Sequence, residues 1–338
     1  VRYVEGVYVG YRYFDSANVK PLFPFGFGKS YTDFSIYKES VSNKKDIITV
    51  TVKVKNEGKY SGKEVVEIYV SPSQENKDKP YQSLVAFKKT KLLEPNEEQS
   101  LTLTFKLSDT ARYDEDSTSY ILDRGTYIVR VGNSSDKTKI FCIISLDEDI
   151  VTEKLKHIGG ESDFGDLELN VVYKDDLSNV EKIELTKDDF TTREVKYDYL
   201  PKTNELISGL SIDKVAKVCI CNFNGVSHLF GEAGETVLDI PEIKNHLVLA
   251  DGPAGLRLVK KYGEDEKGRY RLCVNPIEAR LVDYLTEEEY AKLDTLENNK
   301  DRKGEVHYQF ATAIPIATAL AQSFNEDLVE QIGDIVGK

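Results

Sequence analysis

The sequence contains no methionine and no tryptophan among its 338 residues. It also lacks any run of 18 apolar residues, the length at which a stretch is read as a membrane-spanning helix, so we expect no membrane span. Because the chain starts at Val1 and has no methionine, we expect an incomplete chain whose true N-terminus, with any signal peptide, lies upstream.

Cysteine and histidine are scarce, with four of each. The cysteines are Cys142, Cys219, Cys221 and Cys273, and the histidines are His157, His228, His246 and His307. Neither set has the spacing of a zinc site or a redox pair. We therefore expect the cysteines to be small apolar core residues, and we predict no metal and no cofactor. Free thiols suit a reducing compartment, so a cytoplasmic location is the expectation.

Positive charge is in deficit, with 45 Lys and Arg against 58 Asp and Glu, a net charge of −13. A protein that follows phosphates needs a basic stripe, and none is visible, so nucleic acid is not an expected partner. The same sign disfavours binding to anionic membrane surfaces. Apolar residues make up 40% of the chain, enough for well-packed cores, and the length suggests two or three domains.

A strongly alternating region runs from about residue 34 to 146. Apolar and polar side chains alternate with period two in segments 48–55, 101–107 and 127–131. The apolar positions are Ile48, Val50, Val52, Val54, Leu101, Leu103, Phe105, Leu107, Tyr127, Val129 and Val131. Turn-forming residues separate the segments. About seven short strands, each with one apolar face, predict a β-sandwich over this region.

The flanking regions follow different patterns. Residues 1–33 are rich in Tyr, Phe and Gly, which predicts a strap packed on something larger. Residues 147–245 are charged and read as a connector, with one or two strands expected near 167–172. Ser211 is a candidate N-cap for a short helix that follows it. The glycine-rich segment 231–236 lacks the Lys-Ser/Thr of a nucleotide-binding loop.

The most informative segment lies at residues 247–258. Leu247 to Ala250 form an apolar run that predicts a short buried strand, which ends at Asp251. A glycine- and proline-rich turn follows, and Arg257 comes directly after it. An acid and a base at the end of a strand match the place where α/β barrels build their sites. An ordinary strand exit with two solvated charges is the alternative.

The C-terminal third is mixed. Residues 260–304 are charged and irregular, and apolar character returns at residues 307–315. Ser323 and Glu326 have the spacing of a capping box. In this motif the Ser side chain accepts a hydrogen bond from the backbone amide of the Glu, and the Glu side chain accepts one from the backbone amide of the Ser. We therefore predict a helix beginning at Ser323, with an apolar face that includes Leu328 and Ile332.

Several of these motifs occur together in one known family. Asp251-Gly252-Pro253-Ala254-Gly255-Leu256-Arg257 resembles the turn that opens the barrel domain of glycoside hydrolase family 3, the β-glucosidase family. Residues 3–15 are similar to the end of that family's α/β sandwich domain, and residues 22–31 to the lead into its fibronectin type III-like module. Residues 231–236, 312–315 and 321–325 are similar to stretches around its barrel start.

The resemblance implies a multi-domain α/β plus β protein. Residues 1–33 would be the C-terminal end of an α/β sandwich domain, and 34–146 a fibronectin type III-like β-sandwich. Residues 147–245 would be a connector and pre-barrel segment, and 246–338 the N-terminal part of a (β/α)8-type, or TIM-like, barrel. The sandwich-first order is that of a domain-permuted member of the family.

The resemblance also implies a function, that of a retaining exo-acting β-glycosidase that releases terminal sugars from β-glucosides or oligosaccharides. Asp251 would bind hydroxyls of the terminal sugar, with Arg257 as its partner. The family's nucleophile and acid/base fall outside this chain, so the isolated chain is expected to be inactive. A non-catalytic carbohydrate-binding or adhesion protein built on the β-sandwich is the alternative, and a homo-oligomer stays open.

Overall fold

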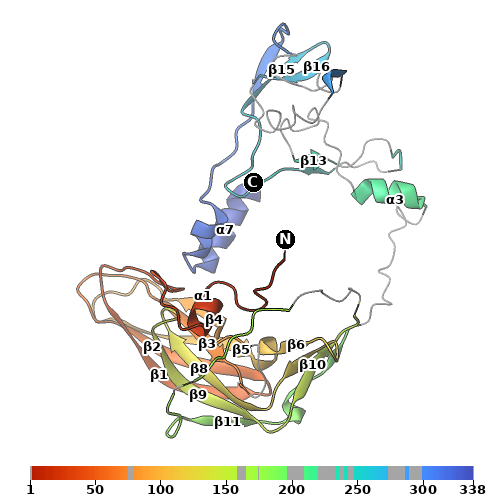
Figure 1. Ribbon diagram of the computed structural model, residues 1–338. Helices are drawn as coiled ribbons and strands as arrows, with labels where there is room; N and C mark the ends of the chain where they lie inside the picture. Colours follow the sequence, from red (N-terminus) through yellow and green to blue (C-terminus); the bar gives the residue numbers. More distant parts are fainter. Residues whose placement is uncertain are drawn as a thin grey trace. The chain divides into compact units, whose positions relative to one another are not determined.

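The structure, a computed structural model, describes residues 2–74, 79–157, 165–173, 175–195, 209–219, 233–235, 240–242, 247–272, 286–288 and 299–337. The chain divides into two compact units, Val1–Tyr199 and Leu200–Lys338. Each unit is described separately below, and Figure 1 gives the labels of their elements.

The first unit is a β-sandwich, as the alternating pattern predicts. Its sheets have the strand orders β1-β2-β5, β12-β10-β7-β6 and β11-β9-β8-β3-β4. The strands are β1 (Phe34–Lys44), β2 (Ile47–Asn56), β3 (Val65–Ser71), β4 (Ser83–Lys89), β5 (Glu98–Lys106), β6 (Arg112–Asp114), β7 (Ser119–Leu122), β8 (Gly125–Gly132), β9 (Thr138–Leu146), β10 (Ile150–Lys154), β11 (Lys182–Leu185) and β12 (Arg193–Glu194). Two short 3-10 turns accompany them, η1 (Leu107–Thr110) and η2 (Lys187–Asp189).

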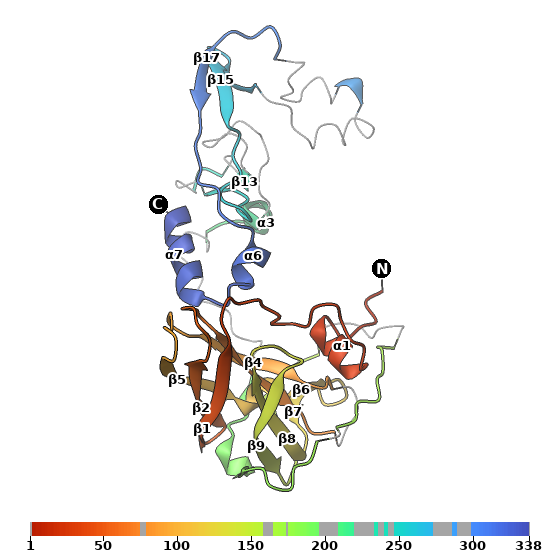
Figure 2. The same ribbon diagram turned by 90° about the vertical axis from the view of Figure 1, so that its left-hand side faces the viewer.

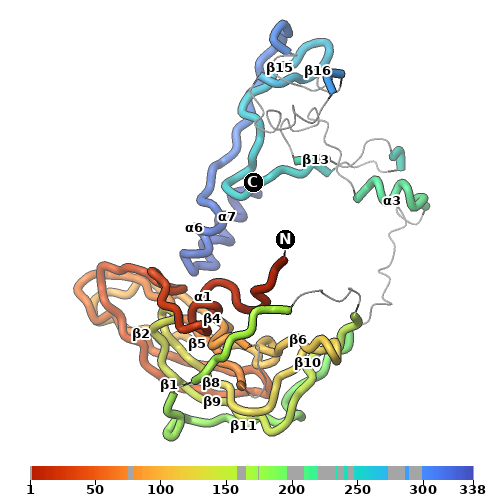
Figure 3. Tube along the Cα trace, in the orientation of Figure 1, coloured from red at the N-terminus to blue at the C-terminus, as the bar shows by residue number. Residues whose placement is uncertain are grey.

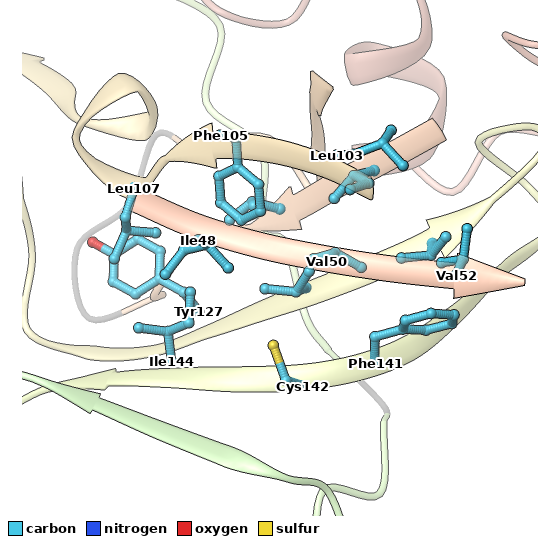
Figure 4. Close-up of a cluster of buried hydrophobic side chains, with 14 of the residues drawn as sticks. Ile48, Val50, Val52, Leu103, Phe105, Leu107, Tyr127, Phe141, Cys142 and Ile144 are labelled. Carbon is cyan, nitrogen blue, oxygen red and sulfur yellow. The ribbon is translucent and has the colours of Figure 1, made fainter. Parts of the chain in front are cut away.

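The core lies between the sheets and is built from the alternating positions. In β2 the side chains of Ile48, Val50 and Val52 are fully buried, whereas the residues between them are more accessible. Val50 pairs with Leu103 of β5, so the two predicted apolar faces meet in register. Figure 4 shows these side chains packed against residues of β8 and β9. The predicted period-two strands are confirmed.

Cys142 belongs to this core, and its burial raises the pKa of the thiol to about 12. The prediction of a core cysteine is therefore confirmed here. It is wrong for Cys219, which is exposed on α3 (Ile212–Cys219), a helix without a buried residue. Cys221 and Cys273 lie outside the described residues.

The aromatic N-terminal segment, here called the strap (residues 2–33), packs on the outer face of the five-stranded sheet. It contains the short helix α1 (Tyr11–Ser16), which lies beside β3 and β4 in Figure 1. The Ser16 hydroxyl accepts a hydrogen bond of 2.8 Å from the Tyr81 amide, and the Tyr11 hydroxyl accepts one of 2.7 Å from the Leu84 amide. The prediction of a packed strap is confirmed.

The sandwich also recruits strands from beyond residue 146. β10 pairs antiparallel with β7, β11 runs parallel to β9, and β12 runs parallel to β10. Segment 167–172, where strands were expected, is irregular. The sequence pattern does not reveal β11 and β12, because both strands are short and charged. Their pairing depends on the edges of sheets that are already formed.

The second unit contains smaller elements. They are α3, β13 (Gly234–Glu235), β14 (Val248–Leu249), β15 (Lys261–Asp265), β16 (Gly268–Arg271), β17 (Glu305–Tyr308), α6 (Ala317–Ala321) and α7 (Glu326–Gly337). β13 pairs with β14, and β16-β15-β17 form a three-stranded antiparallel sheet. Figure 1 labels β15 and β16 of this sheet, and Figure 2 labels β15 and β17. In the part of the chain that the structure describes, no helix is long and apolar enough to span a membrane.

Candidate functional site

The strand before Asp251 forms, although its environment differs from the prediction. β14 covers only Val248 and Leu249, and it pairs antiparallel with Gly234 and Glu235 of β13. Leu247 is 66% exposed and Leu249 49% exposed, so the expectation of a buried strand is wrong. The physical reason is that, among the described residues, this two-residue strand pairs with β13 alone, which is itself only two residues long.

This pairing joins two motifs that the sequence singled out separately. The Ala233 amide donates to the Leu249 carbonyl at 2.8 Å, which extends the β13–β14 pairing by one bond. Residues 233–235 of the glycine-rich segment therefore lie directly beside the strand that leads to Asp251. The described part of that segment, residues 233–235, serves as a pairing strand.

The turn after β14 brings Asp251 and Arg257 together. The Arg257 amide donates to the Asp251 carbonyl at 2.7 Å, which closes the turn through the backbone. The Arg257 guanidinium also forms an ion pair with Oδ2 of the Asp251 carboxylate. The two side chains are 44% and 70% exposed, for Asp251 and Arg257 respectively. An exposed pair of this kind adds about 0–1 kcal/mol to stability, so its main consequence is orientation of the carboxylate.

The Asp251 carboxylate keeps acceptor capacity beyond this pair. An ionised carboxylate has two oxygens and about four lone-pair positions. Among the described residues, its hydrogen-bonded contact is made through Oδ2 alone. Oδ1 is therefore available to accept from a ligand hydroxyl, and hydrogen bonds to an ionised acceptor are roughly twice as strong as neutral ones.

A third motif closes on the same turn. Gly255 has φ +95°, and a Cβ placed on it would lie 2.1 Å from the Thr312 carbonyl oxygen. The Ile314 amide donates to the Ala254 carbonyl at 3.1 Å, so the segment 312–314 runs against the turn. Only glycine fits position 255, because the backbone needs a positive φ and leaves no space for a side chain.

The two segments that leave this turn, residues 256–260 and 309–312, run antiparallel to each other. The Gln309 amide donates to the Lys260 carbonyl at 3.0 Å, and the Gln309 side chain donates to the Val259 carbonyl at 2.8 Å. Lys261 then pairs with Tyr308 at the start of the three-stranded sheet. Figure 3 shows the two segments running side by side from the turn to β15.

The prediction of an irregular region over residues 260–304 is wrong for β15 and β16. Tyr270 is buried, and the Arg302 guanidinium lies 4.1 Å above the centre of its ring. Arg302 Nε also donates to Asp265 at 2.9 Å, which holds the pKa of that carboxyl at about 2. Charged residues form this sheet because they pair with each other and with tyrosine rings, a pattern that hydrophobic periodicity does not reveal.

The last helix begins later than predicted. α7 starts at Glu326, and the side chain of Asn325 accepts the amide of Leu328 at 3.2 Å, which makes Asn325 the N-cap. Ser323 instead donates to the Leu320 carbonyl at 2.6 Å. The predicted capping box at Ser323 is therefore wrong, because Phe324 adopts φ +48° and turns the chain before the helix begins.

The predicted N-cap of the earlier helix α3 is confirmed. The Ser211 hydroxyl accepts a hydrogen bond from the Lys214 amide at 3.4 Å.

The family comparison agrees with the fold of the first unit. Residues 64–135 match the fibronectin type III-like domain. This module is therefore confirmed, as part of the larger β-sandwich.

The chain is similar to curated proteins that are named as β-glucosidases. The chain is 41% identical over 140 residues to thermostable β-glucosidase B of Acetivibrio thermocellus, which covers 40% of this chain and 18% of that protein. It is 37% identical over 137 residues to β-glucosidase BoGH3A of Bacteroides ovatus, with 39% and 18% covered. The structure of β-glucosidase 3B from Thermotoga neapolitana in complex with α-D-glucose is 37% identical, covers 42% of this chain and 20% of that chain, and has a TM-score of 0.40.

The sequence-based resemblance to glycoside hydrolase family 3 β-glucosidases is confirmed by these relatives. The chain spans about a fifth of the length of the curated relatives it matches.

Proposed function

We propose that this chain is part of a retaining, exo-acting β-glycosidase of the β-glucosidase type, which releases terminal sugars from β-glucosides or oligosaccharides. The observation that carries the proposal is the meeting of three motifs at one turn. They come from separate parts of the sequence: β13 pairs with β14, the strand that leads into the Asp251 turn, and segment 312–314 contacts the turn itself. Similarity to named β-glucosidases supplies the reaction class.

Within this proposal Asp251 binds the terminal sugar. Its carboxylate accepts hydroxyls through Oδ1, while the Arg257 guanidinium holds Oδ2 and fixes the orientation of the group. Such positioning matters because a correctly placed anomeric carbon lowers the entropic part of the barrier. The ligand expected here is a β-linked glucoside, in keeping with relatives whose structures contain glucose.

The reaction itself needs groups from elsewhere in the whole protein. Retention requires two carboxylates about 5–5.5 Å apart, one as nucleophile and one as acid/base. We assign neither role within this chain, so the isolated chain is expected to bind sugar without turnover. Residues 246–338 would form the beginning of a barrel that carries the nucleophile, and residues 1–33 the end of an α/β sandwich domain. This order corresponds to the domain-permuted arrangement.

The test is the Asp251→Ala variant of the full-length protein, assayed on 4-nitrophenyl β-glucoside. Loss of a charged hydrogen-bonding group should weaken transition-state binding by about 4 kcal/mol. This corresponds to a decrease in kcat/KM of roughly 1,000-fold. Asp265→Asn is the matched control, because Asp265 also pairs with an arginine in the second unit but lies in the three-stranded sheet. Its kcat/KM should match that of the parent.

Two results would count against the proposal. An unchanged kcat/KM in Asp251→Ala would refute the role of Asp251. Binding of β-glucan by the full-length protein with no hydrolysis of any β-glucoside would instead support a non-catalytic carbohydrate-binding protein.

A further inference from the structure

In the described part of the first unit, the carboxyl group of Glu67 is buried and pairs with no cation. Glu67 lies in the middle of β3, where it pairs with Phe87 of β4 and Gly132 of β8, and it is fully buried. Its neighbours Val66 and Ile68 point into the core. Because successive side chains of a strand point to opposite faces, Glu67 lies on the outer face of the sheet. Its burial there must come from whatever covers that face.

The strap provides that cover. The Phe25 carbonyl accepts the Ser135 amide at 2.9 Å, and the Phe27 amide donates to the Pro24 carbonyl at 3.1 Å, so residues 23–27 form a turn fixed to the loop between β8 and β9. We call these residues the strap turn. Gly26 within it has φ +80°, and a Cβ placed there would lie 2.5 and 2.6 Å from the two carboxylate oxygens of Glu67. The backbone of the strap turn therefore closes directly on the carboxyl group.

Aromatic rings complete the enclosure. The ring of Tyr11 lies 4.8 Å from that of Phe25 and 5.9 Å from that of Tyr69, measured between centroids. The Tyr69 hydroxyl donates to Oε2 of Glu67 at 2.6 Å. Oε1 is buried and has no hydrogen-bond partner among the described residues. One oxygen of the carboxyl is thus satisfied, whereas the other is enclosed by the strap turn.

The charged surroundings do not favour ionisation of Glu67. The titratable groups on the described elements around it are Tyr11, Arg12, Tyr13 and Asp15 of α1, Lys88 and Lys89 of β4, Tyr127 and Arg130 of β8, and Glu64, Tyr69 and Asp136. Among them the charge that acts on Glu67 is that of Glu64. Lys89 lies beside Glu64 and Lys63, and the guanidinium of Arg130 is paired with Asp175. Burial raises the pKa of Glu67 to about 7, with a smaller contribution from the charge of Glu64, and the hydrogen bond from Tyr69 only partly opposes this.

We infer that Glu67 is a protonation-dependent latch, whose neutral carboxyl lets the strap turn close on the sheet and whose ionised carboxylate loosens it. The physical cause is that an ionised carboxylate beneath the closed turn has, among the described residues, the Tyr69 hydroxyl as its one donor and no paired cation, whereas opening the turn admits water. A neutral carboxyl carries a far smaller desolvation cost in the same place.

The sign of the pH dependence follows from the direction of the shift. Burial raises the pKa to about 7 with the turn closed, and we expect it to return to its ordinary value of 4.5 when the turn opens and admits water. Closure is therefore strongest below pH 4.5, weakens as the pH rises from 4.5 to 7, and changes little above pH 7. With these two pKa values the closing constant should fall about 50-fold between pH 5 and 7.5.

Hydrogen exchange of the Ser135 amide tests this, because that amide is bonded to the strap turn. In the 338-residue chain its protection factor should fall about 50-fold between pH 5 and 7.5 and then level off. Glu67→Gln keeps the shape and removes the charge, so protection should stay at its acidic value throughout. Asp15→Asn is the matched control, because Asp15 belongs to helix α1 of the strap and is also partly buried with a raised pKa, and this variant should keep the 50-fold fall.

Three results would overturn the latch. They are a pH-independent protection factor in the parent chain, an unchanged fall in Glu67→Gln, or loss of the fall in Asp15→Asn. A second variant keeps the test decisive if Glu67→Gln does not fold. Gly26→Ala places a methyl group against the carboxyl, so Ser135 should be poorly protected at every pH, and full protection in this variant would also refute the latch.

Discussion

At the scale of single residues, the same pair of side-chain types has two different uses in this chain. The carboxylate of Asp123 is completely buried, accepts Arg112 Nε on Oδ2 at 2.9 Å and Arg112 Nη2 on Oδ1 at 3.1 Å, and also pairs with Lys79. The carboxylate of Asp251 pairs with Arg257 at an exposed turn. The carboxylate of Asp123 therefore stabilises the fold, whereas the carboxylate of Asp251 can still accept a hydrogen bond from a ligand.

We expect Asp123→Asn to destabilise the first unit by about 3–5 kcal/mol, because it leaves the buried Lys79 without its counterion and leaves Arg112 with Asp114 alone. Urea denaturation followed by far-UV circular dichroism measures this change. Glu184→Gln is the control, since Glu184 is an exposed partner of Lys182 and its loss should leave the transition unchanged. Equal midpoints for the two variants would show that the buried cluster does not stabilise the sandwich.

At the scale of elements, short-range signals locate a segment but not its partner. The sequence marks the Asp251 turn, segment 231–236 and segment 312–315 as separate motifs. Their contact depends on backbone hydrogen bonds between positions about 15 to 60 residues apart, such as Ala233 to Leu249 and Ile314 to Ala254. The start of α7 depends likewise on the positive φ of Phe324, which moves the cap from Ser323 to Asn325.

Replacing the cap should loosen only the first turn of α7. Asn325→Ala removes the side-chain acceptor of the Leu328 amide, which should cost about 1 kcal/mol and speed hydrogen exchange at Leu328 roughly 5-fold. Ser323→Ala should leave the exchange of that amide unchanged. The reverse result, faster exchange in Ser323→Ala alone, would restore the capping box expected from the sequence.

At the scale of the whole molecule, the main apolar core belongs to the first unit. Every buried member of the core cluster lies between Ile48 and Leu185, and the cluster includes Ile150 of β10 and Leu185 of β11. These two residues are 3% and 2% exposed, although they follow the region in which the sequence predicts the sandwich. The strands after residue 146 therefore contribute to the stability of the module.

Two fragments test this contribution. A fragment of residues 1–199 should unfold in one cooperative thermal transition, because it contains the whole core cluster. A fragment of residues 1–146 loses Ile150 and Leu185 and should be less stable by about 3–6 kcal/mol, the value of burying two large aliphatic side chains. Chemical denaturation of both fragments gives the difference, and equal stabilities would show that β10 to β12 are dispensable.

The sequence by itself determined the β-sandwich, because period-two alternation in β2, β5 and β8 is a local property that decides which side chains face the core. It also identified the Asp251 turn and its resemblance to the β-glucosidase family. Tertiary structure alone decided which strands join the sandwich after residue 146, which motifs meet at the turn, and that Glu67 is enclosed by the strap. These outcomes depend on surfaces contributed by distant segments, and no local pattern encodes the burial or pairing that such surfaces impose.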